Sequence, residues 1–165
     1  MVTFDEFVSE QGQPLLRLAF VLTGDRHLSE DLTQIALANA FRHWRRVEKA
    51  HYPEAYVRRM LVNAHLDWRR RRSSTESPGV LGDHAQGWDP DPGDAIAARA
   101  QMRALLDGLA PRARTVLVLR YYADLDDAAI ASTMGISVSS VRATASRALV
   151  ALRGAASLVA VEEHR

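Results

Sequence analysis

Apolar residues recur at helical spacing along most of this chain, and no segment alternates apolar and polar residues with the period of a strand. The clearest case lies near the C-terminus, where a short apolar segment stops at Gly135 and a longer one follows Ser137. Gly135 suits the left-handed position that ends a helix, because it has no Cβ to clash. Asp126 and Ser137 each precede a segment whose free N–H groups their side chains can cap. The pattern predicts a helix-turn-helix.

The second helix of this pair divides into two faces. Its buried stripe is expected to consist of Val138, Val141, Ala145, Ala148, Leu149 and Leu152. Small, polar and basic residues are left to face outward, namely Ser139, Ser140, Arg142, Ala143, Ser146 and Arg147. A plain helical hairpin with a solvated face would show the same pattern, so the upstream segments have to decide between the two interpretations.

Three further helices are predicted in the first half of the chain. Thr3 and Glu6 have the spacing of a capping box, and we expect Gly12 and Pro14 to interrupt or kink the helix that follows. The second helix is expected over 28–44, with apolar Leu32, Ile35, Ala36, Ala40 and Phe41. After a loop over 47–52, Pro53 fits the first turn of a third helix that reaches about residue 72. The expected buried stripe of this third helix is Val57, Met60, Leu61, Ala64 and Trp68.

Charge is unevenly distributed, although the formal net charge is only +1. Residues 42–72 hold ten basic and three acidic side chains, more than the end of a helix needs, and this excess favours a polyanionic partner. Residues 73–94 hold five acids and no base. Trp44 and Trp68 could stack on nucleic-acid bases, but we assign both to the core, because Trp68 shares the apolar stripe.

Helical spacing without strand-like alternation predicts an all-α protein of two small helical domains joined by a flexible acidic linker, with the helix-turn-helix in the second domain. The linker, residues 73–93, is rich in Gly and Pro and shows no helical period; its Trp88 either docks on a partner or rests on the chain itself. The domains are therefore 1–72 and 94–165, and the second opens with a helix from Asp94 to Leu106 and another from Pro111. The chain has no Cys and no metal-ligand spacing among its His residues, so we expect no cofactor. No signal peptide and no membrane span are expected, which places the protein in the cytoplasm.

Three segments in series carry a resemblance to a known family. They read LLRLAFVLTGD with SEDLTQIALANAFRHW, PEAYVRRMLVNAHLDWRRRR, and LAPRARTVLVLRYYADLDDAAIASTMGISVSSVRATASRALVALR. They resemble the promoter-melting helices, the −10-reading helix and the −35-reading domain of extracytoplasmic-function (group 4) sigma factors of bacterial RNA polymerase, in the sigma-70 family and of actinobacterial type. The resemblance implies a sigma factor that binds core polymerase through its clamp and flap, recognises promoter DNA and does no catalysis itself.

The resemblance also implies roles for particular residues. The −10 element would be read and melted by Lys49, His51, Tyr52, Arg58, Arg59, Asn63, Arg69 and Arg70. The −35 element would be read by Ser137, Ser139, Ser140, Arg142, Ser146 and Arg147, and the polymerase would be bound by Asp31, Gln34, Asn39 and Arg42. Ile35 and Asn39 stand where an acid and an arginine are usual in the family. Arg142, Ala143 and Thr144 replace its common Lys, Ser and basic or amide residue, so we expect a distinct −35 preference.

Other classes of protein stay open on the sequence. A stand-alone helix-turn-helix regulator would bind duplex DNA unaided and usually needs a dimerising element. A recombinase would need a strand-rich catalytic domain, which the helical first half argues against, and a purely structural helical adaptor would not need the basic cluster. An anti-sigma factor is a further candidate partner of the sigma-like interpretation.

Overall fold

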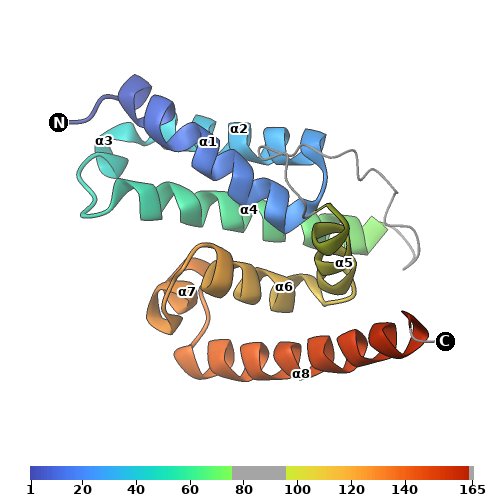
Figure 1. The fold of residues 1–165 in the computed structure, drawn as a ribbon. Helices are drawn as coiled ribbons and strands as arrows, with labels where there is room; N and C mark the ends of the chain where they lie inside the picture. Colours follow the sequence, from blue (N-terminus) through green and yellow to red (C-terminus); the bar gives the residue numbers. More distant parts are fainter. Residues whose placement is uncertain (76–95, 164–165) are drawn as a thin grey trace. The chain divides into compact units, whose positions relative to one another are not determined.

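The computed structural model describes residues 1–75 and 96–163, and every regular element in these ranges is helical (Figure 1). The chain divides into two compact units, one built from α1 to α4 and the other from α5 to α8. We call them unit 1 and unit 2. The prediction of an all-α protein with two helical domains is confirmed. Residues 73–75 of the predicted linker are helical, whereas the rest of it, with Trp88, and the predicted helix start at Asp94 lie outside the described residues.

In unit 1 the first helix, α1, spans Phe4–Thr23 and begins with the predicted capping box. The Glu6 N–H donates to Thr3 Oγ1 over 3.3 Å, and the Thr3 N–H donates to Glu6 Oε2 over 2.8 Å. The helix ends at Gly24, whose φ of 69° is left-handed. The expected interruption at Gly12 and Pro14 is wrong, because α1 continues through both. Pro14 is exposed while Leu15 beside it is buried, and tertiary packing of the apolar face outweighs one missing backbone donor.

The second helix, α2, spans Arg26–Arg42, so the predicted bounds of 28 and 44 are each two residues late. Asp25 starts it by accepting from the Leu28 N–H over 2.9 Å. Trp44 opens a separate short helix, α3, which spans Trp44–Val47 and ends on a fully buried valine. The predicted loop over 47–52 therefore begins one residue later.

The longest helix of unit 1, α4, spans Pro53–Thr75, and it contacts both α1 and α2 in a three-helix bundle (Figure 1). Its buried residues are Val57, Leu61, Val62 and His65. The predicted stripe is thus wrong in part, since Met60, Ala64 and Trp68 are only half-buried. A helix that packs against two neighbours buries a wide sector, and here that sector is turned toward Val62 and His65.

Unit 2 begins with α5, Ile96–Asp107, and α6, Pro111–Leu117, with proline in the first turn as predicted. The chain then widens into a π-helical turn, η1, Val118–Tyr122, in which the Ala123 N–H donates to the Val118 carbonyl over 3.1 Å. Sequence periodicity did not indicate this turn. Leu119 is fully buried in this turn, whereas Tyr121 is 64% exposed.

The helix-turn-helix consists of α7, Asp127–Met134, and α8, Val138–Glu163. All three predicted caps are confirmed. Asp126 accepts from the Ala129 N–H over 2.7 Å, Gly135 is left-handed with a φ of 66°, and Ser137 accepts from the Ser140 N–H over 3.1 Å. Val141, Ala145 and Ala148 form the buried stripe of α8, with Val138, Leu149 and Leu152 half-buried beside them.

Candidate nucleic-acid and polymerase interfaces

The outward face of α8 is the most regular candidate surface of unit 2. Its exposed residues are Ser139, Ser140, Arg142, Ala143, Ser146 and Arg147. They recur at three- and four-residue steps and lie on the side of the helix away from the buried stripe. Helix packing therefore presents hydroxyl, methyl and guanidinium groups together on one convex surface, which has the width to enter a DNA major groove.

A cluster of hydroxyl groups marks the N-terminus of α8. Ser137 Oγ lies 3.0 Å from Ser139 Oγ, and it donates to Ser140 Oγ over 2.9 Å while capping the Ser140 N–H. Ser137 is thus a structural cap as well as a predicted DNA contact. The positive end of the helix dipole and these hydroxyls together favour an anion such as a phosphate.

Arg142 is the one predicted DNA-binding residue of α8 with an ion pair to another helix among the described residues. Its Nε donates to Asp127 Oδ2 over 3.0 Å, and Arg120 of η1 donates to the other oxygen of the same carboxylate. The hydrogen bond from Arg120, followed by that from Arg142, holds the pKa of the Asp127 carboxyl below its ordinary value. Sequence reasoning missed Asp127 and Arg120, because they lie far from Arg142 along the chain and no periodicity joins them.

The four arginines of α4 that are predicted to contact −10 DNA form two pairs. Arg59 and Arg70, with Asn63 between them, are exposed on one face. Arg58 and Arg69 lie three helical turns apart on another side of the helix and are half-buried beside its core-facing residues. Arg70 also pairs with Asp67 one turn away, in an arrangement so exposed that it should contribute little stability.

The loop between α3 and α4 holds the other predicted −10 residues, all of them exposed: Lys49, His51 and Tyr52. The rings of His51 and Tyr52 meet edge to face with centroids 4.5 Å apart. Since Pro53 starts α4 directly after Tyr52, these side chains lie at the N-terminal end of the helix that holds Asn63. An exposed aromatic ring beside a cation can stack on an unpaired base.

The two tryptophans of unit 1 differ in surroundings, although both are half-buried. Trp44 packs against Phe4 and Phe7, with both ring centroids 5.4 Å away. This placement agrees with the predicted core role. The Trp68 ring instead lies beneath arginine side chains, with the guanidinium carbon of Arg72 5.1 Å from its centroid, so it borders the basic cluster.

On α2, the predicted polymerase-binding residues share an outward face. Asp31, Gln34 and Arg42 are exposed and Asn39 is half-buried. Ile35 is 49% exposed in the middle of this face, so its assignment to the apolar core is wrong. The core takes Ser29 and Thr33 instead, because their hydroxyls donate to the carbonyls of Asp25 and Ser29 over 2.5 and 2.7 Å. Buried hydroxyls satisfied in this way cost little.

Phe41, the other apolar residue expected inside, is 61% exposed at the end of α2. Its ring rests edge to face on Phe4 of α1, with centroids 5.0 Å apart. A spacing pattern cannot distinguish a surface aromatic of this kind from a core residue, since both fall at helical intervals.

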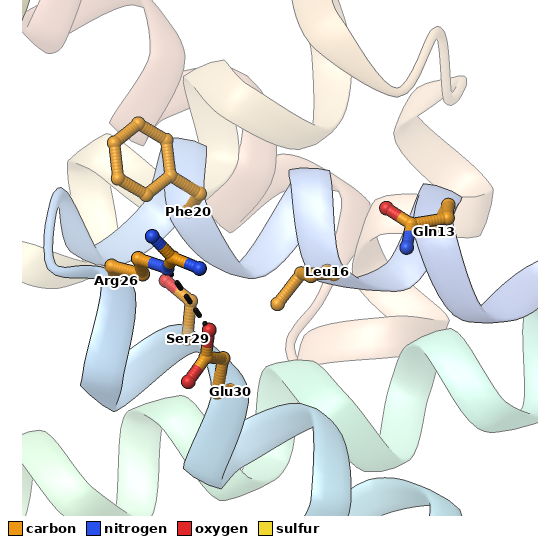
Figure 2. Close-up of a pocket in the computed structure, with 6 residues that line it drawn as sticks. All are labelled: Gln13, Leu16, Phe20, Arg26, Ser29 and Glu30. Atoms are coloured by element: carbon orange, nitrogen blue, oxygen red, sulfur yellow. Dashed lines mark hydrogen bonds and ion pairs between the residues drawn. The ribbon is translucent and has the colours of Figure 1, made fainter. Parts of the chain in front are cut away.

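A small polar depression of about 270 Å³ lies between α1 and α2 (Figure 2). Its lining residues are Gln13, Leu16, Phe20, Arg26, Ser29 and Glu30. Arg26 Nε donates to Glu30 Oε1 over 3.1 Å on one side of it, and the Ser29 hydroxyl is engaged with the Asp25 carbonyl. None of the predicted site residues lines this depression, so it is separate from the surfaces above.

The described ranges also bear on metal binding and on membrane insertion. No three His, Cys, Asp or Glu side chains there gather in a way that could hold a metal ion. No helix in residues 1–75 or 96–163 is long and apolar enough to span a membrane.

Comparison with known families divides the chain as the structure does. Residues 7–75 match sigma-70 region 2, and residues 99–152 match sigma-70, region 4. The first match covers α2 to α4 and most of α1, and the second covers α7 and α8 as far as residue 152.

Individual relatives agree. The RNA polymerase sigma-E factor of Streptomyces coelicolor is 33% identical over 93% of this chain and 85% of its own length. The ECF RNA polymerase sigma factor SigE of Mycolicibacterium smegmatis is 30% identical over 93% of this chain and 61% of its own length. Among solved structures, the sigma factor RpoE of Bartonella quintana, in complex with the anti-sigma factor NepR, has the same fold, with a TM-score of 0.69. That match has 20% identity and covers 92% of this chain and 94% of that one.

The two regions together, with full-length relatives at this identity, define a promoter-recognition subunit of bacterial RNA polymerase. The chain belongs to the extracytoplasmic-function sigma factors of the sigma-70 family, of actinobacterial type. As a sigma factor it binds core RNA polymerase and directs promoter-specific transcription initiation, a role in which the family itself is not enzymatic.

Proposed function

We propose that this sigma factor grips a promoter at two places, with α8 on the −35 duplex and with α4 and its preceding loop on the −10 element. The supporting observation is that each unit exposes a polar and basic helix face on an element within a sigma-70 match. Nothing about the relative placement of the units is needed, because each face is complete on its own unit.

At the −35 element, α8 lies in the major groove with its N-terminal turns toward the bases. Arg142 and Arg147 read base edges, since a guanidinium can donate to two acceptors on a guanine. The hydroxyls of Ser137, Ser139, Ser140 and Ser146 hold phosphates, which sets the register of the helix on the DNA. Ala143 and Thr144 stand where the family usually has longer polar groups, so this helix selects a −35 sequence of its own.

At the −10 element, the loop captures a base that has left the stack. Lys49, His51 and Tyr52, with Asn63 on α4, form the base-holding group, and Arg58, Arg59, Arg69 and Arg70 guide the phosphates of the freed strand. Unstacking a base costs a few kcal/mol. Stacking on an aromatic ring contributes about 1–3 kcal/mol per base, and phosphate contacts add a salt-dependent term, so together they offset the cost.

The outward face of α2 holds the polymerase clamp. Asp31, Gln34, Asn39 and Arg42 supply polar contacts around the exposed Ile35, so this contact has an apolar centre in place of the acid usual in the family. An apolar centre with a polar rim is typical of protein interfaces.

We further assign −10 and clamp recognition to residues 1–72 and −35 and flap contacts to 94–165, with 73–93 as the acidic connection. The chain acts in the cytoplasm, where its polymerase is, and it supplies no catalytic group, since the polymerase does the chemistry. An anti-sigma factor is a candidate regulator, as in the solved relative.

The test is transcription from a defined promoter with purified chain and core polymerase. Transcripts should require both proteins, and exchanging Asp31 and Gln34 for Ala should lower core binding at least tenfold. His27→Ala, at an exposed position on the same helix, is the matched control and should change neither core binding nor transcription.

The alternative, a stand-alone regulator, predicts a different result. Such a protein would bind the promoter duplex equally well without the polymerase, and the α2 substitutions would leave that binding unchanged. Sequence-specific binding by the isolated chain without any polymerase-dependent transcript would overturn the proposed function.

A further inference from the structure

The Asp127 carboxylate lies between two arginines that come from different elements of unit 2. One oxygen accepts from Arg120 of η1, and the other accepts from Arg142 Nε of α8 over 3.0 Å. The side chains of Asp127 and Arg120 are each 24% exposed, whereas that of Arg142 is 71% exposed. Asp127 and Arg120 are therefore half-buried, whereas Arg142 reaches the surface of the proposed DNA-reading face of α8.

The atom of Arg142 that makes this bond matters for recognition. Arg142 donates to Asp127 through its Nε. A guanidinium is planar, so a bond at Nε leaves the edge formed by Nη1 and Nη2 directed away from the acceptor. That edge can donate to O6 and N7 of a guanine in the bidentate way.

Arg120 completes the arrangement by holding the acceptor in place. A lone carboxylate near DNA would repel phosphates, but two guanidinium groups around one carboxylate leave the set with a net positive charge. The hydrogen bond from Arg120 also lowers the pKa of the Asp127 carboxyl, which keeps the acceptor anionic. The orientation of Arg142 is thus set before DNA arrives, which reduces the loss of side-chain freedom on binding.

We infer that Asp127 is a positioning residue that fixes the Arg142 guanidinium for a guanine in the −35 element. This inference rests on the proposed function, because it presumes that α8 lies in the −35 major groove. The inference goes beyond the proposed function, because it assigns base specificity to a residue of α7 that does not itself contact a base.

A merely structural role for Asp127 predicts other behaviour. As an acid in the first turn of α7, it also stabilises the helix through the dipole. If that were its whole role, its loss would weaken binding to every DNA sequence alike. A positioning role instead lowers the preference for one base and leaves affinity for unrelated DNA intact or higher, since Arg142 is then free to contact phosphates.

The experiment measures equilibrium binding of the polymerase holoenzyme to promoter duplexes in which each −35 base pair is exchanged in turn. Unrelated duplex serves as the reference for non-specific affinity. The variants are Asp127→Asn, Asp127→Glu, Arg142→Lys and Arg142→Ala. Asp124→Asn is the matched control, because Asp124 is exposed, lies close in sequence, and has a left-handed φ of 53° that asparagine tolerates.

For the wild type, exchanging the guanine read by Arg142 should cost on the order of tenfold or more in affinity. Asp127→Asn should reduce this discrimination at that position to about threefold or less, and Asp127→Glu should restore part of it. Arg142→Lys and Arg142→Ala should lose discrimination at the same base pair, and Asp124→Asn should keep it. Asp127→Glu keeps an acid in the first turn of α7 but displaces the carboxylate, so a partial loss of discrimination there tests the inference even if Asp127→Asn fails to fold.

Full discrimination at every −35 position in Asp127→Asn would overturn the inference, as would an equal loss of affinity for promoter and unrelated duplex. Failure of the proposed function looks different, because the wild-type holoenzyme itself would then show no −35 preference.

Discussion

The Arg114 guanidinium holds the end of α5 by donating from Nε to the Leu106 carbonyl over 2.9 Å. A second nitrogen donates to the Asp107 carbonyl over 3.2 Å, and a third lies 3.3 Å from its carboxylate. Arg114 is only 2% exposed. The last carbonyls of a helix have no partner within it, and here a buried arginine of the next helix donates to two of them, while the Leu109 N–H also donates to that of Leu106.

Replacing Arg114 with Ala should therefore destabilise unit 2 by about 2–3 kcal/mol, because it removes the hydrogen bonds from the guanidinium to the Leu106 and Asp107 carbonyls and opens a cavity. Hydrogen exchange of the full chain should show faster exchange in α5, α6 and α8, with α1 to α4 unchanged. Arg112→Ala, at an exposed position of the same helix, is the matched control and should stay within about 0.5 kcal/mol of wild type. Equal protection in the two variants would contradict the role given to Arg114.

A second prediction concerns the acid titration of Asp127. Hydrogen bonds from Arg120 and then Arg142 lower the pKa of this carboxyl in the folded chain. A group whose folded pKa is depressed adds stability above its unfolded value, about 3.9, and that stability is lost as the pH falls through the folded value. The carboxyl carbon resonance of Asp127 should thus titrate below the ordinary range. Arg120→Met should move the midpoint upward, and an unmoved midpoint would show that Arg120 is not the main cause.

Local features of this fold were predictable from sequence, and the caps show why. Asp126, Gly135 and Ser137 act on backbone groups within one turn of themselves, so their residue type and position suffice. The buried stripe of α8 was predictable for the same reason, since one apolar face meets the other helices of its unit.

Features that depend on tertiary packing were not predictable. The sector that α4 buries is decided by two neighbouring helices, which is why Val62 and His65 replaced Met60 and Trp68 in the core. The π-helical turn that follows α6 was not predicted, because no spacing pattern marks such a turn in advance. The bonds of Asp127 join residues far apart in sequence, so the outward set on α8 was predicted while the residue that holds Arg142 was missed.

A third prediction separates the two roles of Ser137. Ser137→Ala removes the cap of α8 and should lower the stability of unit 2 by about 1 kcal/mol. Ser137→Asp keeps a capping oxygen and should preserve stability, but it places a negative charge beside the proposed phosphate contacts. Holoenzyme affinity for the −35 duplex should therefore fall more in Ser137→Asp than in Ser137→Ala. Thermal denaturation and −35 duplex binding, measured on both variants, test this prediction. The reverse order of affinities would show that Ser137 acts only as a helix cap.

The last prediction uses the division of the α4 arginines into an exposed and a half-buried pair. Arg59 and Arg70 are exposed, so exchanging either for Gln should leave the fold intact and remove one phosphate contact. The slope of log K against log salt for holoenzyme on a melted −10 template should then become less steep by about 0.7, the single-strand value for one phosphate. Arg58 and Arg69 lie beside the core, and Gln at either position should also lower the stability of unit 1.

Arg26→Gln is the matched control for these slopes, because Arg26 is an exposed arginine of α2 that pairs with Glu30 and is not among the proposed DNA contacts. This substitution removes one positive charge from unit 1 outside the proposed −10 contacts. The salt-dependence slope of Arg26→Gln should therefore equal that of wild type. A change in Arg26→Gln as large as in Arg59→Gln would mean that the slope reports the total charge of unit 1. Arg59 and Arg70 would then make no specific contact with the phosphates of the freed strand.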